Sequence, residues 1–110
     1  MDVLSHILRA SARLSVVVYR IVQETLTNIA KYAAATDVSI EITHEAATKQ
    51  HQGKIKIEIS DNGIGFDLRR KTTGFGLEGV NYRATAVGGA MQIESGVGFG
   101  TKVSVQIPLK

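Results

Sequence analysis

The strongest pattern in the first third of the chain is helical. Between about Leu14 and Ala35, apolar residues recur at spacings of three and four, within about 80° of arc on a helix. The residues of this apolar stripe are Val18, Val22, Leu26, Ile29 and Ala33. We therefore predict one long helix over this range, with the stripe facing the core.

Four later segments alternate apolar and polar residues, which is typical of strands with one buried face. The first two, "VSIEIT" and "KIKIEI", are joined by the polar hairpin loop "HEAATKQHQG", and the last two are "AMQIES" and "TKVSVQIPL". Sheets with one polar face are usually antiparallel and carry helices on the other face only. A fully parallel sheet would need continuous apolar runs, and the sequence has none.

A second helix is predicted over about 77–87, followed by two glycines that would end it. Its apolar residues are Leu77, Val80, Ala84 and Val87. The segment Val3 to Leu8 could be a short edge strand or a frayed helical turn. The order (β)αββ-loop-αββ predicts an α+β fold, a two-layer α/β sandwich with a mixed, mostly antiparallel sheet and helices on one face.

The composition is typical of one small cytosolic domain. The chain has 110 residues, of which 44% are hydrophobic, and a formal net charge of +3. Lysine and arginine are scattered apart from Arg69-Arg70-Lys71, so we expect no nucleic-acid partner. The lack of cysteine excludes disulfides, zinc–thiolate sites and thiol catalysis. No apolar run reaches the roughly 18 residues that span a bilayer, and "MDVLSHILRASARLSVVV" is too polar and basic for a signal peptide.

Three polar residues of the first helix, Glu24, Asn28 and Lys31, share one side within about 60° of arc, roughly opposite the apolar stripe. One interpretation is a solvated helix face with a favourable Glu24–Lys31 neighbourhood. The other is a magnesium-phosphate site. There the Asn28 carbonyl would be a hard ligand, Glu24 would orient water or accept a proton, and Lys31 would meet phosphate. Ile21 and Thr25 lie beside this face, which suggests that it is not wholly exposed.

The glycine-rich segments raise a second question. "SDNGIGFD" follows the strand "KIKIEI", and Asn-Gly usually marks a hairpin turn, but the next residues, "LRRKTTGFGLEG", do not form a strand pattern. The carboxylate of Asp61 would accept a hydrogen bond from an exocyclic amine such as that of adenine. "GFGLEG" lies where the second helix begins, and free N–H groups there favour phosphate. "GVGFGT" alone is more typical of a hairpin turn.

Taken together and in this order, four segments resemble one family. They are "YRIVQETLTNIAKYA", "DNGIGFD", "GFGLEGVNYRATAVGGAMQIESGVGFGT" and "KVSVQIPL". They are similar to the ATP-binding catalytic domain of bacterial sensor histidine kinases, most of all the nitrate/nitrite-sensor subfamily, within the GHKL superfamily that also holds gyrase B. The resemblance covers about 14–108. It implies the Bergerat ATP-binding fold and the cofactors ATP and Mg²⁺.

The resemblance assigns roles on the first helix residue by residue. Asn28 matches the magnesium ligand, and Glu24 matches the general base or water-orienting acid. Lys31 matches a basic position near the phosphates. The family often has histidine at the next position, where this chain has Tyr32, whose phenol can donate a hydrogen bond but carries no positive charge.

Further nucleotide-binding roles fall on the later motifs. Asp61 matches the aspartate that binds the adenine amine, and Gly63 and Gly65 match the glycines beside the base. Thr101 matches a threonine that supports adenine through water. The resemblance also implies a mobile lid over about 68–73 that is flanked by Gly74 and Gly76, and it places Leu77 in the nucleotide site.

The function that the resemblance implies is transfer of the γ-phosphoryl group of ATP to a histidine on a separate dimerising domain, and from there signalling to a response regulator. We expect residues 1–110 to be a single, excised catalytic domain that lacks the phosphoacceptor domain, is monomeric, binds ATP and does not phosphorylate itself. The full-length kinase would be a homodimer anchored in the bacterial inner membrane, with this domain in the cytoplasm.

Two alternatives remain on the same fold. One is a protein serine kinase of the anti-sigma type, which would phosphorylate a partner protein directly. The other is a non-enzymatic scaffold with a degenerate pocket, against which the intact Glu24, Asn28 and Asp61 argue.

Overall fold

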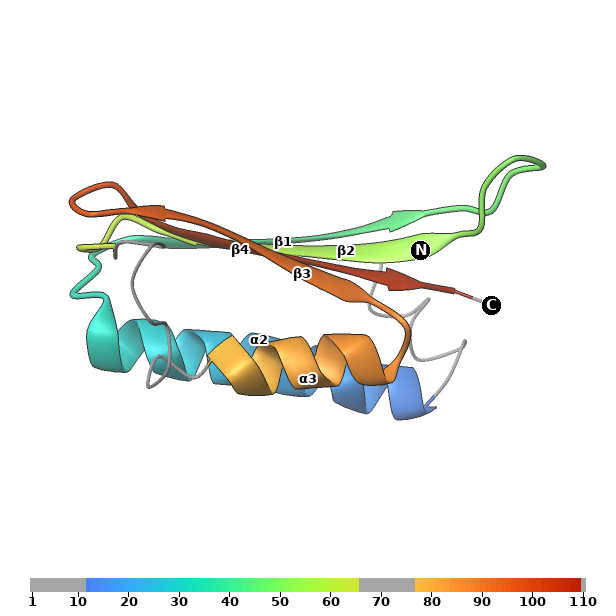
Figure 1. Ribbon diagram of the computed structural model, residues 1–110, viewed down its shortest axis with the longest axis horizontal. Helices are drawn as coiled ribbons and strands as arrows, with labels where there is room; N and C mark the ends of the chain where they lie inside the picture. The colour runs from blue at the N-terminus through green and yellow to red at the C-terminus, as the bar shows by residue number, and fades with distance from the viewer. Residues whose placement is uncertain (1–11, 66–76, 110) are drawn as a thin grey trace.

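The computed structural model describes residues 12–65 and 77–109, which form two helices under one face of a four-stranded sheet (Figure 1). The elements are α2 (Ala12–Tyr32), β1 (Val38–Glu45), β2 (Lys54–Asp61), α3 (Leu77–Ala86), β3 (Ala90–Gly96) and β4 (Gly100–Pro108). This confirms the predicted α+β sandwich with helices on one face. The segment from Val3 to Leu8 lies outside the described residues. Neither described helix is long and apolar enough to cross a membrane.

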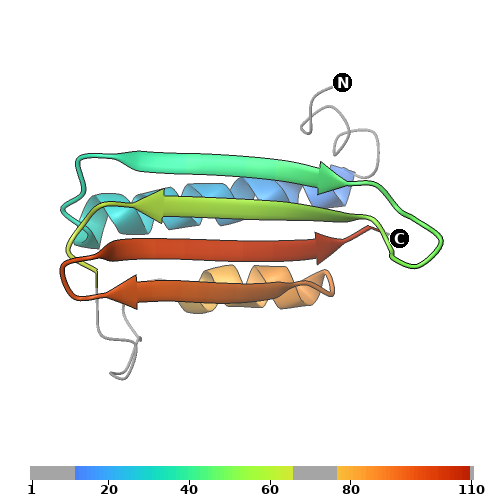
Figure 2. The same ribbon diagram turned by 90° about the horizontal axis from the view of Figure 1, so that it is seen from above.

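The sheet has the order β1-β2-β4-β3, and each neighbouring pair is antiparallel (Figure 2). Hairpins join β1 to β2 and β3 to β4, and the two hairpins meet where β2 pairs with β4. The predicted sheet was mixed, and in the described part of the chain its pairings are all antiparallel. Because β2 and β4 pair antiparallel, the last residues of β2 lie beside the first residues of β4.

The core lies between the inner face of the central strands and the two helices. Every second residue of β2 and β4 points into it, as the alternation in the sequence predicts. These strand residues are 4% exposed or less: Ile55, Ile57, Ile59, Val103, Val105 and Ile107. The helices contribute Leu14, Val18, Ile21, Leu77, Val80 and Ala84.

The predicted apolar stripe of α2 packs against the core, but the most buried side of the helix is rotated away from the middle of the stripe. Ile21 and Thr25 are 0% and 2% exposed, whereas Val22, Leu26 and Ile29 are only partly buried. The helix packs against α3 as well as the sheet, so burial is greatest on the side between them. Thr25 can be buried because its hydroxyl donates a 2.7 Å hydrogen bond to the Ile21 carbonyl.

This rotation changes the surroundings of the polar residues on α2. Glu24 lies three residues from the buried Ile21, and Asn28 lies three residues from the buried Thr25, so each is about 60° around the helix from the core. We expected these polar residues roughly opposite the core-facing side. They lie along its flank instead.

The end of α2 was also predicted too late. The helix ends at Tyr32, and Ala34 has a positive φ of 50°, in the left-handed region that stops a helix. The amide of Ala33 still donates to the Ile29 carbonyl at 3.0 Å, which is the last helical hydrogen bond. A run of alanines has a high helix propensity, so the pattern alone could not show where the helix ends.

Candidate functional site

A row of residues crosses all four strands at one end of the sheet. Val38 pairs with Asp61, Asp61 with Thr101, and Thr101 with Ser95. The alternation of strand side chains places this row on the helix-facing side, two residues beyond Ile59 of the core. The apolar inner face of the sheet therefore ends in three polar side chains.

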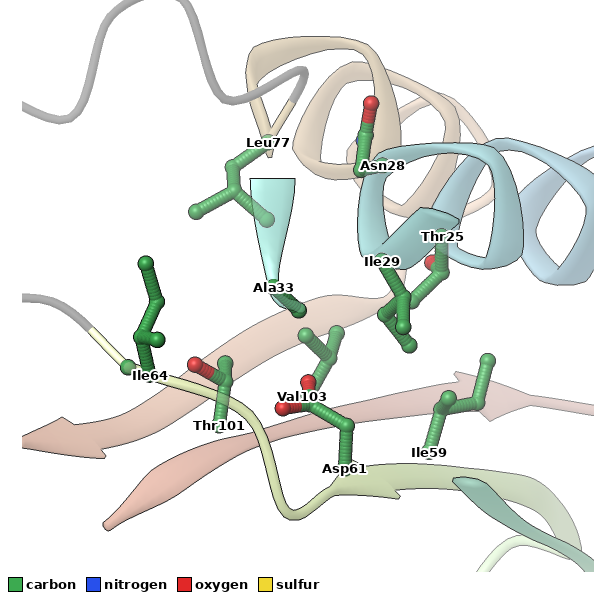
Figure 3. A pocket seen from close by; sticks show the side chains of 11 residues that line it. Thr25, Asn28, Ile29, Ala33, Ile59, Asp61, Ile64, Leu77, Thr101 and Val103 are labelled. Atoms are coloured by element: carbon green, nitrogen blue, oxygen red, sulfur yellow. The ribbon is translucent and has the colours of Figure 1, made fainter. Parts of the chain in front are cut away.

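A cavity of about 170 Å³ lies between this row and the helices (Figure 3). Its lining is mostly apolar, with polar groups at a few points. The lining residues are Thr25, Asn28, Ile29, Ala33, Ile59, Asp61, Ile64, Gly65, Leu77, Thr101 and Val103. The volume is roughly ten times what one water molecule needs. Apolar walls with a polar end are suited to a ring that carries hydrogen-bonding groups on one edge.

Asp61 is the charged group of this cavity. It is the last residue of β2 and is partly buried. Its Oδ1 accepts a 2.8 Å hydrogen bond from the backbone N–H of Gly63, which fixes the direction of the carboxylate. An ionised carboxylate only accepts and has about four lone-pair positions, so Asp61 can also receive a donor from a bound molecule.

Asn28 reaches the cavity from α2. Its Nδ2 is buried, and within 12–65 and 77–109 it has no hydrogen-bond partner. Leaving a buried donor unpaired costs about 1–3 kcal/mol, so an amide in this state is more typical of a binding site than of a core.

The fit of Asn28 to a metal ion depends on the ligands around it. In the described part of the chain, no group of three His, Cys, Asp or Glu residues could hold a metal ion. A magnesium ion binds with few protein ligands when phosphate oxygens and water supply the others. One amide oxygen beside a cavity therefore suits magnesium on a phosphate ligand and does not suit a closed structural site.

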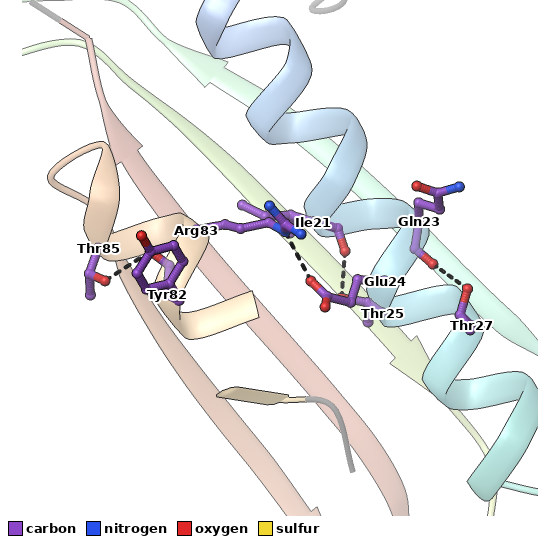
Figure 4. A network of polar contacts seen from close by, with 8 residues as sticks. All are labelled: Ile21, Gln23, Glu24, Thr25, Thr27, Tyr82, Arg83 and Thr85. Atoms are coloured by element: carbon purple, nitrogen blue, oxygen red, sulfur yellow. Dashed lines mark hydrogen bonds and ion pairs between the residues drawn. The ribbon is translucent and has the colours of Figure 1, made fainter. Parts of the chain in front are cut away.

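Glu24 is turned away from the cavity and towards α3. Its Oε2 accepts a 3.1 Å hydrogen bond from Nε of Arg83 in an ion pair that joins the two helices (Figure 4). A Cβ at Gly79 would overlap the same carboxylate, so the glycine leaves the space in which Glu24 lies. The interpretation of this side as a solvated face placed Glu24 near Lys31. Lys31 is exposed, and neither residue is among the cavity-lining residues.

Asn62 explains why the Asn-Gly pair after β2 is not a hairpin turn. Its Oδ1 accepts 2.9 Å hydrogen bonds from the backbone N–H groups of Thr36 and Asp37. Its Nδ2 donates to the hydroxyl of Thr36 at 2.8 Å and to the carboxylate of Asp37 at 3.2 Å. The side chain therefore ties the end of β2 to the connection between α2 and β1.

The glycines of this segment allow the chain to approach itself closely. A Cβ at Gly63 would overlap the carbonyl of Ala33, and the next amide, that of Ile64, donates to this carbonyl at 2.8 Å. Gly65 has a φ of 65° and lies against the backbone of Gly96. We predicted that these glycines make room for a ligand. In the structure they hold Ile64 at the cavity, and of the two only Gly65 lines it.

Several predicted site residues lie outside the described residues. They are Gly74, Gly76 and the lid over 68–73; Tyr32 is described only as the last residue of α2. Leu77, which the resemblance places in the nucleotide site, is the first residue of α3, is 7% exposed and lines the cavity.

The sequence interpretation missed the apolar walls and the polar partners of the site. Ile59 and Val103 were given no role in the site, although each lies two residues along a strand face from Asp61 or Thr101, a spacing that could have indicated a wall. No sequence signal links Arg83 to Glu24 or Ser95 to Thr101, because these pairs form only in the folded chain.

Comparison with known proteins relates this chain to a family. The model of the histidine kinase-, DNA gyrase B- and HSP90-like ATPase family matches residues 14–110. The chain is 37% identical over 103 residues to the oxygen sensor histidine kinase NreB of Staphylococcus carnosus (strain TM300), covering 92% of this chain and 28% of that protein. It is 37% identical over 94 residues to the sensor histidine kinase ComP of Bacillus subtilis (strain 168), covering 83% of this chain and 11% of that protein.

Solved structures share the fold at low sequence identity. The histidine kinase domain of the Erythrobacter litoralis EL346 blue-light activated histidine kinase superposes with a TM-score of 0.65 at 20% identity, over 88% of this chain and 45% of that chain. The Acinetobacter baumannii histidine kinase AdeS superposes with a TM-score of 0.64 at 19% identity, over 87% of this chain and 47% of that one. At these identities the likeness shows the fold alone.

Proposed function

The chain belongs to the histidine kinase-, DNA gyrase B- and HSP90-like ATPase family, and on this premise we propose that it is the ATP-binding catalytic domain of a two-component sensor histidine kinase. The family implies that ATP binds. The observation that supports the site is the polar row at the end of β2 and β4, where Asp61 and Thr101 close a mostly apolar cavity. The curated relatives NreB and ComP are sensor histidine kinases, which does not favour the serine kinase alternative.

The cavity would take the adenine ring of ATP. Asp61 would accept a hydrogen bond from the exocyclic amine. The hydrogen bond that Asp61 accepts from the Gly63 amide already fixes the direction of the carboxylate. Ile59, Ile64 and Val103 would pack against the ring and keep water from it. A charged acceptor inside apolar walls gives both affinity and selectivity, because a molecule without the matching donor would leave the carboxylate unpaired.

The phosphates would lie towards α2. Asn28 would hold Mg²⁺ through its amide oxygen, and the ion would neutralise phosphate charge as the γ-phosphoryl group departs. Glu24 lies one helical turn before Asn28, where Arg83 pairs with it beside the cavity, and we propose it as the general base or water-orienting acid of the transfer. Lys31, one turn after Asn28 and exposed, would meet phosphate charge from the solvent side.

The remaining nucleotide contacts follow from the family motifs. Leu77 would pack against the nucleotide at the start of α3, and Tyr32 would donate a hydrogen bond to phosphate. Gly74 and Gly76 would flank the lid.

The acceptor and the signalling partners belong to the rest of the kinase. The chain spans 28% of NreB and 11% of ComP. We propose that a dimerising domain of the same protein supplies the acceptor histidine, that a response regulator receives the phosphoryl group, and that the full-length kinase is a membrane-anchored homodimer. In this arrangement residues 1–110 are one domain that binds ATP and needs the other domain for transfer.

Calorimetric titration of the chain with ATP and Mg²⁺ tests this proposal. We expect binding at micromolar to millimolar strength, and a loss of at least about tenfold for Asp61→Asn, because the new amide can present an N–H₂ group to the adenine amine. Glu41→Gln, which removes a charge from the exposed outer side of β1, is the matched control and should bind as the wild type does. Equal affinity of Asp61→Asn and wild type would contradict the adenine assignment.

The kinase class is tested on the full-length protein. Incubation with labelled ATP should give a phosphoryl linkage that is labile in acid and stable in alkali, as a phosphohistidine is. An acid-stable linkage on a serine would support the alternative instead.

A further inference from the structure

Two polar side chains and one backbone carbonyl at the end of the sheet form hydrogen bonds that determine where one proton lies. Oγ of Ser95 lies 3.0 Å from the carbonyl oxygen of Gly100, which can only accept, so the hydroxyl proton of Ser95 is in that bond. The same Oγ lies 2.8 Å from Oγ1 of Thr101. A hydroxyl group carries a single proton, and Thr101 must therefore be the donor in the second bond.

Thr101 consequently offers only lone pairs to any further partner. Asp61, which pairs with Thr101 across β2 and β4, is also an acceptor when ionised. Both residues line the cavity from adjacent strands (Figure 3). These two side chains thus present acceptors, and no donor, to the edge of a bound ring.

From this arrangement we propose that Ser95 sets the base specificity of the cavity, by holding the Thr101 proton so that the site takes a base with an exocyclic amine and rejects one with an oxo group in its place. Ser95 is a positioning residue, because it is not among the residues that line this cavity. The proposal rests on the proposed nucleotide site. It adds a determinant of base specificity, Ser95, that acts through Thr101 and does not itself face the nucleotide.

The site would reject an oxo group because hydrogen-bond acceptors would then face other acceptors. An amine offers N–H hydrogens to the Asp61 and Thr101 acceptors, whereas an oxo group would face them with its own lone pairs. A site whose acceptors receive an amine rejects an analogue that presents lone pairs at the same position, since the acceptors there are then left unpaired. Without the Ser95 hydroxyl, the Thr101 proton could turn towards the cavity and donate to an oxo group.

The test compares ATP with inosine triphosphate, which carries an oxo group in place of the amine. Calorimetric titration of the chain in Mg²⁺ should show wild type binding ATP at least about tenfold more tightly. In Ser95→Ala, ATP affinity should change by less than about twofold, while the preference for ATP should fall by about three- to tenfold, the value of one hydrogen bond. Ser95→Thr keeps the hydroxyl and should keep the wild-type preference.

Two further variants separate this effect from a general disturbance. Ser104→Ala removes a hydroxyl from the opposite side of β4 and should leave the preference unchanged. Ser95→Cys, whose thiol is a weak donor, gives the same test with a smaller change if Ser95→Ala folds poorly, as judged by circular dichroism.

The outcomes are distinguishable. An unchanged preference in folded Ser95→Ala or Ser95→Cys, or a wild type that binds both nucleotides equally, would overturn the role of Ser95 and leave ATP binding intact. If neither nucleotide binds to the wild type, the proposed function itself fails, and this inference fails with it.

Discussion

Nε of Arg83 lies 3.1 Å from Oε2 of Glu24, and this ion pair joins α3 to α2 beside the cavity. The side chains are 37% and 32% exposed, so the pair is partly screened by solvent and contributes modestly to stability by charge alone. Its structural importance lies in position. Glu24 occupies space that Gly79 leaves open, so the side chain and the glycine determine how closely the helices approach.

A double-mutant cycle on Gly79 and Glu24 tests this close packing. Gly→Ala inside a helix normally stabilises by about 0.5–1 kcal/mol. In the wild type we expect Gly79→Ala to destabilise by about 1 kcal/mol instead, because the new Cβ displaces the Glu24 carboxylate from Arg83. In the Glu24→Ala background the same change should stabilise by about 0.5–1 kcal/mol. Urea unfolding measures both, and the same sign in the two backgrounds would contradict the packing argument.

The fold was largely predictable because local patterns determine it. Alternation located the strands, since residues such as Ile57 and Val105 face one core throughout. The rotation of α2 was not predictable from its own sequence. Thr25 is polar by type, but it is buried because its hydroxyl bonds within the helix, and because α3 covers that side of α2.

The site was predictable only in part, for a related reason. Motif residues such as Asp61, Asn28 and Thr101 do line one cavity. Partners far apart in sequence were not predictable, because a pair such as Ser95 and Thr101 is set by strand register. The Asn-Gly pair was misleading for the same reason, since the side chain of Asn62 bonds to residues 25 and 26 positions earlier.

Gly63→Ala should be much more destabilising than Gly98→Ala. A Cβ at Gly63 would overlap the backbone carbonyl of Ala33, which cannot move without shifting the end of α2, so we expect a loss of about 2–3 kcal/mol. Gly98 has a φ of 82° but nothing within 4 Å of a new Cβ, so Gly98→Ala should cost only the left-handed strain of about 1 kcal/mol. Chemical denaturation compares the two variants, and equal losses would show that the chain at Gly63 relaxes.

Asn62→Ala should loosen the segment that carries the cavity wall. The variant loses hydrogen bonds to Thr36 and Asp37 in an exposed position, so we expect a loss of about 1–2 kcal/mol in the free energy of unfolding. Amide exchange of Ile64 should speed up, because its bond to the Ala33 carbonyl depends on this anchor. Asn81→Ala, on the exposed side of α3, is the control and should be neutral or slightly stabilising. Similar losses in both variants would refute the anchoring role.

Glu58 should make the stability of the sheet depend on pH. Hydrogen bonds from Lys56 at 2.8 Å and Lys102 at 2.9 Å lower the pKa of its carboxyl below the ordinary 4.5. A carboxyl whose pKa is lowered by folding contributes stability above its unfolded pKa, and this contribution is lost as pH falls through the folded pKa. Glu58→Gln should therefore lower the melting temperature at pH 7 but not in acid below that folded pKa.

Salt provides the control for this effect. Because the three groups lie on the exposed face of the sheet, high ionic strength should reduce the difference between Glu58→Gln and wild type at pH 7. A difference that persists in acid would mean that Glu58 acts by packing and not by charge.

Asn28→Ala should separate stability from ligand binding. The buried Nδ2 has no partner in the described part of the chain, so removing it should leave the ligand-free protein equally stable or slightly more stable. The same variant should lose the magnesium-dependent part of its ATP affinity, whereas Asn28→Asp keeps an oxygen ligand and should retain it. Calorimetry with and without Mg²⁺, beside thermal melting of the free proteins, measures both effects. A destabilised Asn28→Ala with unchanged magnesium dependence would instead make Asn28 an ordinary structural residue of α2.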